Sequence, residues 1–263
     1  MFSDARLTNL IANTLMLLSV VALVVGAIVW VAKRPYFAIE RVDIEPLGAP
    51  MLEYVSPATV RATIAGRLAG NFFFTDLDKV RELMESVPWV RKAQVKRVWP
   101  NTLRVAFEEQ QPLAFWNQDE MINTWGESFS ANQGELSDNV VLPQLNGPDA
   151  SERLVVQRYA EIARWFAPLD LRVQEVTLSP RYAWEVTLSN GLRLELGRDP
   201  AADVADPHGR SGALPFAERI ERFVQAWPVL LSRLDGRTPG SADLRYPNGF
   251  SITLAPVSNT SEN

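Results

Sequence analysis

The sequence predicts an α+β protein with one N-terminal transmembrane helix, then an α+β domain and a mixed β-domain with flanking helices. Three observations support this fold class. An uncharged apolar run lies near the N-terminus, residues 36–108 show the order strand, helix, helix, strand, strand, and residues 109–256 combine short apolar strands with two long helical segments. Elements in such an order form layered domains in which helices cover a sheet. We therefore expect two domains, at residues 36–108 and 109–256.

The N-terminal apolar run covers residues 7–32 and contains no Asp, Glu, Lys, Arg or Pro. A bilayer core about 30 Å thick requires roughly 20 helical residues, because each residue adds about 1.5 Å. A cleaved signal peptide usually has an apolar core of only about 7–15 residues, so a retained span is favoured. We place the transmembrane helix at residues 10–32, with Trp30, Lys33, Arg34 and Tyr36 at the membrane interface.

The charges around this span do not fix its orientation. Arg6 precedes the span, whereas Lys33, Arg34 and Arg41 follow it. Counted literally, the positive-inside rule would leave the C-terminal side in the cytoplasm, but the rule weakens when a long domain follows the span. Charge alone therefore leaves both topologies open.

The first domain is expected to contain two short helices packed on three strands. Ser56 followed by Pro57 predicts a helix start, because the hydroxyl caps free N–H groups and proline fits the first turn. Thr75, three residues before Asp78, predicts the start of a second helix through a capping box. The strands are expected at residues 36–45, 93–99 and 102–107.

Two clusters of this domain have simple structural interpretations. The aromatic run at residues 72–74 lies between the two helices and is expected to plug the core. Four basic residues belong to the predicted hairpin and are expected on its solvated face, where they would form neither a lipid site nor a nucleic-acid site; these are Arg91, Lys92, Lys96 and Arg97.

The second domain is expected to contain recurring short strands and two amphipathic helices. Asn190-Gly191 is a strong signal for a two-residue hairpin turn. The helices are predicted at residues 151–166 and 214–234, the latter with a kink at Pro228. The strands are predicted at residues 113–116, 120–123, 172–178, 184–188, 192–196, 242–246 and 250–254. Residues 257–263 are expected to form a disordered tail.

The composition argues against an enzyme and against a cofactor or metal site. Cysteine is absent and His208 is the only histidine, so thiolate chemistry, His-pair metal sites and most serine–histidine catalysis are excluded. The carboxylate neighbours Glu108-Glu109 and Asp119-Glu120 point to opposite faces of a strand and are read as solvated. A formal net charge of −5 argues against wholesale nucleic-acid binding. The function class that remains is binding of another protein chain. Residues 250–254 are predicted to form either an edge strand, which could add a partner strand to the sheet, or a central strand.

Several ordered motifs resemble the FtsQ/DivIB family, including its POTRA domain. The segments that carry the likeness are 70–77 (GNFFFTDL), 88–90 (PWV), 97–103 (RVWPNTL), 116–117 (WN), 141–143 (VLP), 196–198 (LGR), 228–230 (PVL) and 243–246 (DLRY). They span nearly the whole chain in the order of the family. The segment at residues 199–212 is longer than the usual join in the family, and the residues after Asn248-Gly249 diverge from it.

The resemblance implies a non-catalytic division protein. It implies a cytoplasmic tail at residues 1–9, a single pass through the cell inner membrane, and a periplasmic POTRA domain followed by a periplasmic β-domain. Such proteins recruit FtsB and FtsL to the septum and help to control septal peptidoglycan synthesis. An alternative is a POTRA-type receptor in envelope protein export or assembly, although such receptors usually carry several POTRA repeats and barrel strands of about 10 residues. An envelope enzyme that acts on cell-wall glycan is a further alternative, which the missing catalytic motifs disfavour.

The resemblance also implies a partner-binding site on the β-domain, where a partner segment is received partly by strand addition. For Gly249 the local sequence also favours glycine, because the turn is expected to need a positive φ there and a residue without a side chain allows close approach of another backbone. The residues at matching positions are Arg181, as a contact for a partner carboxylate, and Arg245, Tyr246, Asn248, Gly249, Phe250 and Ser251.

Overall fold

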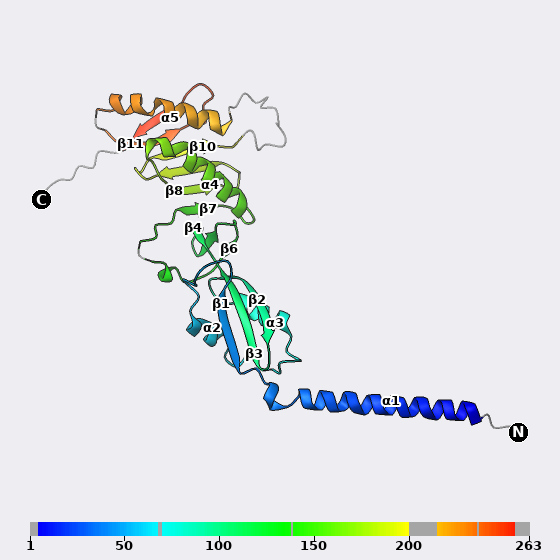
Figure 1. Ribbon diagram of the computed structural model, residues 1–263. Helices are drawn as coiled ribbons and strands as arrows, with labels where there is room; N and C mark the ends of the chain where they lie inside the picture. Colours follow the sequence, from blue (N-terminus) through cyan, green and yellow to red (C-terminus); the bar gives the residue numbers. More distant parts are fainter. Residues whose placement is uncertain (1–4, 68–69, 138, 200–214, 236, 256–263) are drawn as a thin grey trace. The chain divides into compact units, whose positions relative to one another are not determined.

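The computed structural model describes residues 5–67, 70–137, 139–199, 215–235 and 237–255. The chain divides into two compact units, Met1–Gln110 and Gln111–Asn263, and each has its own sheet (Figure 1). Helices, a three-stranded sheet and a nine-stranded sheet together confirm the predicted α+β class. The expectations for His208, for the tail at 257–263 and for nearly all of the 199–212 segment fall outside the described residues.

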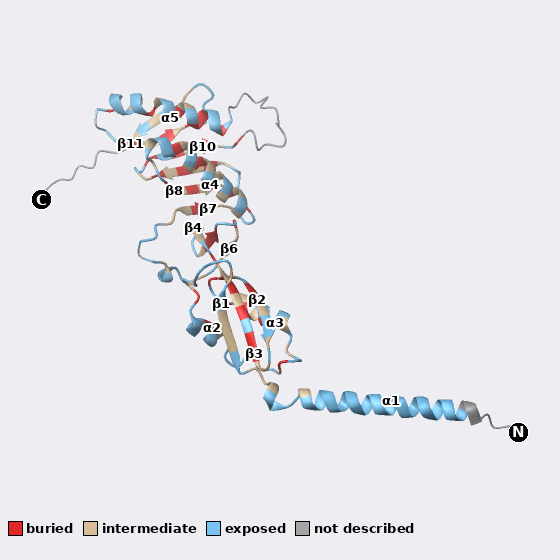
Figure 2. Ribbon diagram, viewed as in Figure 1, coloured by how far each residue is buried: buried red, intermediate tan, exposed pale blue. Residues whose placement is uncertain are grey.

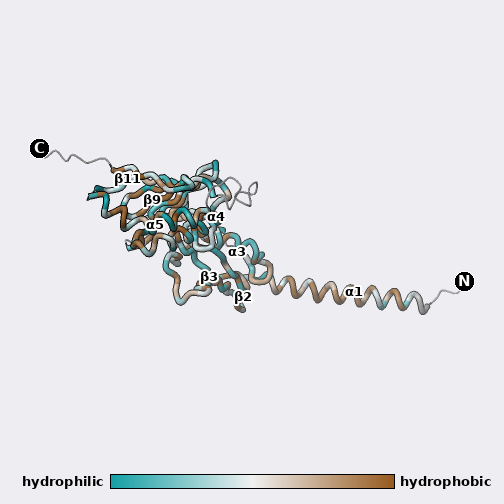
Figure 3. The backbone as a smooth tube through the Cα atoms, turned by 90° about the horizontal axis from the view of Figure 1, so that it is seen from above, coloured by the Kyte–Doolittle hydropathy of each residue, from teal (hydrophilic) through white to brown (hydrophobic). Residues whose placement is uncertain are grey.

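Helix α1, Ala5–Ala32, is the apolar N-terminal helix. Its part from Thr8 to Ala32 is long and apolar enough to cross a membrane, and no residue of the apolar window is buried by the protein. Figures 2 and 3 show the helix exposed and largely hydrophobic along its length. The helix contains the predicted span of residues 10–32 and extends N-terminally beyond it, since residues 5–9 are helical as well.

The first unit folds around a three-stranded sheet in the order β1-β3-β2, in which β1 is parallel and β2 antiparallel to β3. The central strand β3 carries the most buried side chains, as Figure 2 shows. The elements after α1 are η1 (Pro35–Phe37), β1 (Arg41–Pro46), α2 (Pro57–Ile64), α3 (Leu77–Glu85), β2 (Val90–Val98) and β3 (Thr102–Glu109). The first strand was expected from residue 36 and begins at Arg41, because residues 35–37 form the short 3₁₀ turn η1 instead.

Side-chain caps start both helices of this unit. The Ser56 hydroxyl accepts the Thr59 N–H at 3.1 Å, as the sequence predicts for α2. Helix α3 begins one residue later than its predicted capping box, since Asp76 is the N-cap and accepts the N–H groups of Asp78 and Lys79. The hydroxyl of Thr75 turns back to the carbonyl of Asn71 at 2.8 Å and so stabilises the preceding turn.

Two expectations for the first unit are wrong in part. Only Phe72 of the aromatic run is buried, whereas Phe73 and Phe74 are 46% and 56% exposed. Among the basic residues, Lys92 and Lys96 are solvated as expected, but Arg91 pairs with Glu108 in a half-buried position and Arg97 anchors the 72–75 turn.

The carboxylate of Glu109 is also not free in solvent. Its two oxygens accept the backbone N–H groups of Glu53, Tyr54 and Val55 at 2.8, 2.9 and 2.6 Å. The end of β3 thereby holds the loop that leads into α2, and burial with the nearby carboxylates Glu53 and Glu109 raises the pKa of Tyr54.

The second unit is built on a nine-stranded mixed sheet in the order β12-β11-β10-β9-β8-β7-β4-β5-β6. Its strands are β4 (Pro112–Trp116), β5 (Glu120–Asn123), β6 (Ser128–Phe129), β7 (Gln144–Asn146), β8 (Val173–Leu178), β9 (Trp184–Leu188), β10 (Arg193–Gly197), β11 (Pro239–Asp243) and β12 (Ser251–Leu254). Its helices are η2 (Gln133–Glu135), α4 (Glu152–Phe166), η3 (Ala167–Leu169) and α5 (Phe216–Arg233).

Helices α4 and α5 cover the same face of this sheet. Phe166 of α4 and Phe223 of α5 meet at a ring-centroid distance of 6.4 Å, and both are fully buried against the apolar side chains of the central strands. Helix α5 continues through Pro228, where the sequence predicts a kink. Strand β11 ends at Asp243, three residues before the predicted end, because the chain leaves the sheet at Leu244.

Candidate partner-binding rim of the C-terminal unit

The seven predicted site residues all lie at one end of the nine-stranded sheet. Strands β8, β10 and β11 end there, and β9 and β12 begin there, because β8–β9, β9–β10 and β11–β12 are antiparallel while β10–β11 is parallel. Arg181 lies in the β8–β9 turn, and residues 245–251 lead from β11 into β12. We call this end the rim and define it as residues 179–183, 197–199 and 243–251.

Strand β12 is the outermost strand of the sheet on this side. It pairs with β11 through the partners Asp243↔Ser251, Ala242↔Ile252 and Ser241↔Thr253. Within the described residues no strand pairs with its other side. An edge strand directs about half of its backbone N–H and C=O groups away from its neighbour, so β12 offers hydrogen-bonding groups to a further strand.

Arg245 is held in an ion-pair network at the rim. Its guanidinium donates to both oxygens of Asp243 at 2.8 and 2.6 Å and approaches Glu195 at 3.0 Å. The side chain also covers Gly197, where an added Cβ would lie 2.9 Å from Arg245 Cγ. The hydrogen bonds that Arg245 donates to Asp243 raise the pKa of Arg245, so this exposed cation stays charged. The network therefore holds the Arg245 side chain in one orientation.

The loop between β11 and β12 presents Tyr246 and Asn248 to solvent. Tyr246 is 53% exposed and Asn248 is exposed as well. Two contacts with α5 hold the loop: Arg222 donates to the carbonyl of Pro247 at 2.8 Å, and the ring of Phe250 packs edge-on against Phe223 at 5.1 Å. The exposed tyrosine thus projects from an ordered loop, which lowers the entropic cost of binding through it.

Gly249 has neither of the features that its sequence context suggests. It is not among the described glycines with positive φ, and a Cβ added there would meet nothing within 4 Å. The expectation of a left-handed turn at this residue is therefore wrong.

Arg181 lies on the same rim, beyond the ends of β10 and β9. Its carbonyl accepts the Arg198 guanidinium at 2.9 Å, while its own side chain is exposed and has no ion pair within the described part of the chain. With neighbouring strands about 4.8 Å apart, the ends of β8 and β11 are separated by roughly 14 Å. One bound segment of a few residues can span that distance.

A buried arginine that the sequence did not indicate supports the rim from below. Arg219 of α5 is only 6% exposed and donates to the carbonyls of Leu196 at 2.7 Å and Arg198 at 3.0 Å. Burial lowers the pKa of Arg219, and Asp199 and Asp243 oppose that effect. The spacing in the sequence could have predicted that Arg219 is buried, because it lies three residues after Phe216 and four before Phe223, on the inward face of α5.

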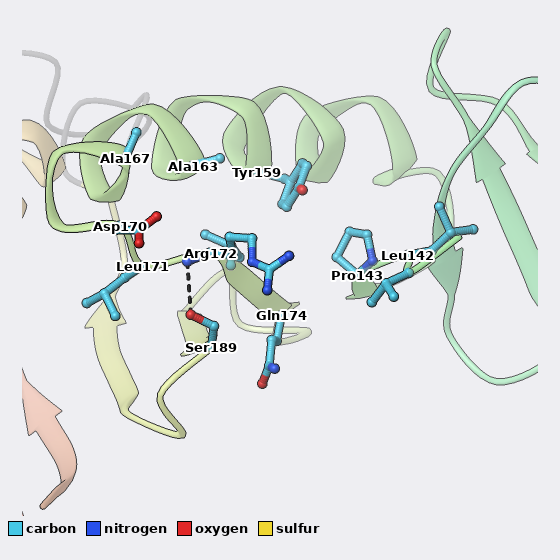
Figure 4. Close-up of a pocket in the computed structure, with 12 residues that line it drawn as sticks. Leu142, Pro143, Tyr159, Ala163, Ala167, Asp170, Leu171, Arg172, Gln174 and Ser189 are labelled. Carbon is cyan, nitrogen blue, oxygen red and sulfur yellow. Dashed lines mark hydrogen bonds between the residues drawn. The ribbon is translucent and has the colours of Figure 1, made fainter. Parts of the chain in front are cut away.

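A separate cavity of about 530 Å³ lies between α4, the loop before β7 and the start of β8 (Figure 4). Its polar side chains include Asp170, Arg172 and Ser189, and the Ser189 hydroxyl accepts the backbone N–H of Arg172 at 3.1 Å. The described residues that line the cavity include no histidine or lysine beside this serine. The cavity contains none of the predicted site residues.

Acid is expected to destabilise the rim through Asp243. Hydrogen bonds from Arg245 lower the pKa of Asp243 below its ordinary value of 3.8, and burial only partly opposes this effect. Because the folded-state pKa is the lower one, the stabilisation is fully present above pH 3.8 and is lost as the pH falls through the lowered pKa. Thermal unfolding between pH 6 and pH 2, at roughly half-unit steps, should show a steeper fall of Tm below about pH 4 for the wild type than for Asp243→Asn. Equal slopes for the two proteins would contradict this role.

Comparison with known proteins places these two units in one family. The family model for the C-terminal region of the cell division protein FtsQ/DivIB matches residues 114–245, and the FtsQ-type POTRA model matches residues 51–110. The chain is 63% identical to the cell division protein FtsQ of Bordetella pertussis over 257 residues, which cover 98% of this chain and 94% of that protein. It is 45% identical to that of Burkholderia pseudomallei, over 97% of this chain and 95% of that protein. The chain therefore belongs to the FtsQ/DivIB family of cell division proteins.

Proposed function

We propose that the chain is a non-catalytic scaffold of the divisome that captures other single-span division proteins, FtsB and FtsL, through its C-terminal unit. In this proposal α1 crosses the cell inner membrane once, the N-terminus lies in the cytoplasm, and both units lie in the periplasm at the septum. By holding these partners the protein helps to control septal peptidoglycan synthesis. Its family membership supports a role in division, and the rim supports the mode of capture.

The observation that carries the proposal is the open outer side of β12 beside an ordered, partly cationic rim. Strand addition to an exposed edge supplies affinity through main-chain hydrogen bonds, and side chains next to the edge supply specificity. Arg245 and Tyr246 stand where the added strand would pass onto the rim, and Arg181 stands further along for a partner carboxylate. None of these roles requires a reacting group.

Disulfide cross-linking tests the strand-addition mode directly. The chain contains no cysteine, so Thr253→Cys places a unique thiol on an exposed position of β12. Against a periplasmic FtsB segment scanned with single cysteines, cross-links are expected to recur at alternate positions, because side chains alternate along a strand. Cross-links that recur at every third or fourth position would indicate a helical partner and would contradict strand addition.

A matched control uses the opposite edge of the same sheet. Ser128 is exposed on β6, which is the outermost strand on the other side. Ser128→Cys is expected to give no periodic cross-links under the same conditions. Equal cross-linking from positions 128 and 253 would show that capture is not specific to β12.

A further inference from the structure

A second surface of the chain, in the first unit, is formed by exposed aromatic rings. Among the described residues of this unit outside α1, the exposed large hydrophobic residues are Met51 and four aromatic residues. The aromatic residues are Tyr36, Phe73, Phe74 and Trp99, with exposures of 65%, 46%, 56% and 69%. Exposed aromatic rings gathered on one end of a domain indicate an interaction surface.

Hydrogen bonds bring these rings to one end of the unit. Phe72 donates its N–H to the carbonyl of Phe37 at 2.7 Å, and the rings of Phe37 and Phe73 meet at 5.0 Å. Arg97, two residues before Trp99, donates to the carbonyls of Phe72 at 2.6 Å and Thr75 at 2.5 Å. Both the 72–75 turn and the β2–β3 turn are therefore fixed beside η1.

A further pair of contacts places the β2–β3 turn beside the start of β1. The Glu40 N–H donates to the carbonyl of Asn101 at 3.0 Å, and the Asn101 amide donates back to the Glu40 carboxylate at 2.9 Å. Trp99 thus lies between two anchored residues, Arg97 and Asn101, at the end of the unit where the chain arrives from α1.

This end is tied closely to the end of the apolar helix. Phe37 follows the last residue of α1, Ala32, by only five positions, which allows at most about 18 Å of extended chain. Asn71 also donates its side-chain amide to the carbonyl of Ala32 at 2.7 Å. If α1 spans a bilayer, the aromatic end therefore cannot move far from the surface of that bilayer.

The charge at this end matches a lipid surface. Three segments form this end, at residues 33–41, 70–76 and 96–102. Their acidic residues are Glu40 and Asp76, and their five basic residues are Lys33, Arg34, Arg41, Lys96 and Arg97. The end is therefore basic, although the whole chain has a net charge of −5. Tryptophan and tyrosine favour the headgroup region of a bilayer, and basic residues near an anionic leaflet each add about 1 kcal/mol of attraction. A water-facing site would not explain four uncovered aromatic rings beside these cations.

We propose that Tyr36, Phe73, Phe74 and Trp99 form a membrane-docking surface that rests in the headgroup layer of the leaflet from which α1 emerges. The aromatic rings insert beside the acyl boundary, and the basic residues contact lipid phosphates. Docking of this kind fixes the height and tilt of the first unit above the membrane. This docking proposal depends only on the insertion of α1 into a bilayer. If the docking proposal failed, the proposed partner-binding rim would be unaffected.

Spin labelling of the full-length protein in vesicles of phosphatidylcholine and phosphatidylglycerol tests the docking. Because the chain lacks cysteine, Phe74→Cys and Met51→Cys each give a single label. Met51 is 71% exposed and follows the opposite end of β1, so it serves as the matched water-facing position. The label at position 74 is expected to collide several-fold less with a water-soluble nickel complex, and more with oxygen, than the label at position 51. Equal accessibility at the two positions would overturn the proposal.

A second variant separates docking from local shielding. Adding Trp99→Ala to the Phe74→Cys protein should raise the nickel accessibility of the label toward that at position 51, because one of the inserted rings is lost. Trp125→Ala, which removes a 39% exposed tryptophan from the other unit, should leave it unchanged. Protection that depends on the protein-to-lipid ratio would identify a second copy as the occupant and would also overturn the proposal.

Discussion

Replacing Tyr246 with alanine is expected to weaken binding of an FtsB periplasmic segment by at least about thirtyfold, equivalent to about 2 kcal/mol. The side chain is a rigid aromatic group on a held loop, and tyrosines in such positions often dominate interfaces. It is 53% exposed in the free chain, so its removal opens no core cavity. Titration calorimetry with a fragment that begins at residue 33 and contains both units measures the affinity directly.

Two measurements make the Tyr246 result specific. The Tm of Tyr246→Ala should equal that of the wild type to within the effect of an ordinary surface substitution, about 0.5 kcal/mol. Tyr36→Ala removes a similarly exposed tyrosine, 65% exposed, from the other unit and should bind the segment normally. If Tyr246→Ala bound as tightly as the wild type, the partner contact assigned to the rim would be wrong.

Strands with alternating apolar residues could be predicted closely from the sequence, whereas a polar strand could not. The strand at residues 184–188 has the predicted bounds, because every second side chain is apolar and buried. The strand at residues 120–123 also has the predicted bounds, although its buried residues are consecutive. Strand β7, with the sequence QLN, was missed although it lies inside the sheet. Its polar side chains form hydrogen bonds with residues distant in the sequence, such as those of Asn146 with Glu175 and Thr177. Such partners cannot be predicted from a local sequence pattern.

The candidate site shows the same division between local and non-local information. The resemblance supplied the seven residues, but their gathering at one rim depends on strand order, which the sequence left open for residues 250–254. The ion partners of Arg245 were also not predicted, since Glu195 lies on a neighbouring strand. In the first unit, the aromatic run was read as core because apolar residues usually are, although Phe73 and Phe74 face outward.

Replacing Arg219 with methionine is expected to destabilise the C-terminal unit by about 3 kcal/mol. Methionine fills much of the space, but it cannot donate to the carbonyls of Leu196 and Arg198, and each buried acceptor left unpaired costs about 1–3 kcal/mol. Removing the desolvated charge returns part of that cost, since burial lowers the pKa of Arg219. Urea unfolding of the fragment from residue 33, followed by tryptophan fluorescence, gives the difference in free energy of unfolding.

Arg222→Met is the matched control for the Arg219 prediction, because both arginines lie on α5 and each donates to a backbone carbonyl of the rim, that of Arg198 or that of Pro247. Arg222 is half-buried and its hydrogen bond to Pro247 is exposed to water, which can replace the lost donor, so its loss should cost less than about 1 kcal/mol. A conservative Arg219→Lys change should recover part of the stability, because an ammonium can still reach one carbonyl. Equal losses for Arg219→Met and Arg222→Met would show that the buried guanidinium does not hold the ends of β10 in place. A loss confined to Arg219→Met, with partial recovery by lysine, would mean that the rim depends on a buried charge donated from the inward face of α5.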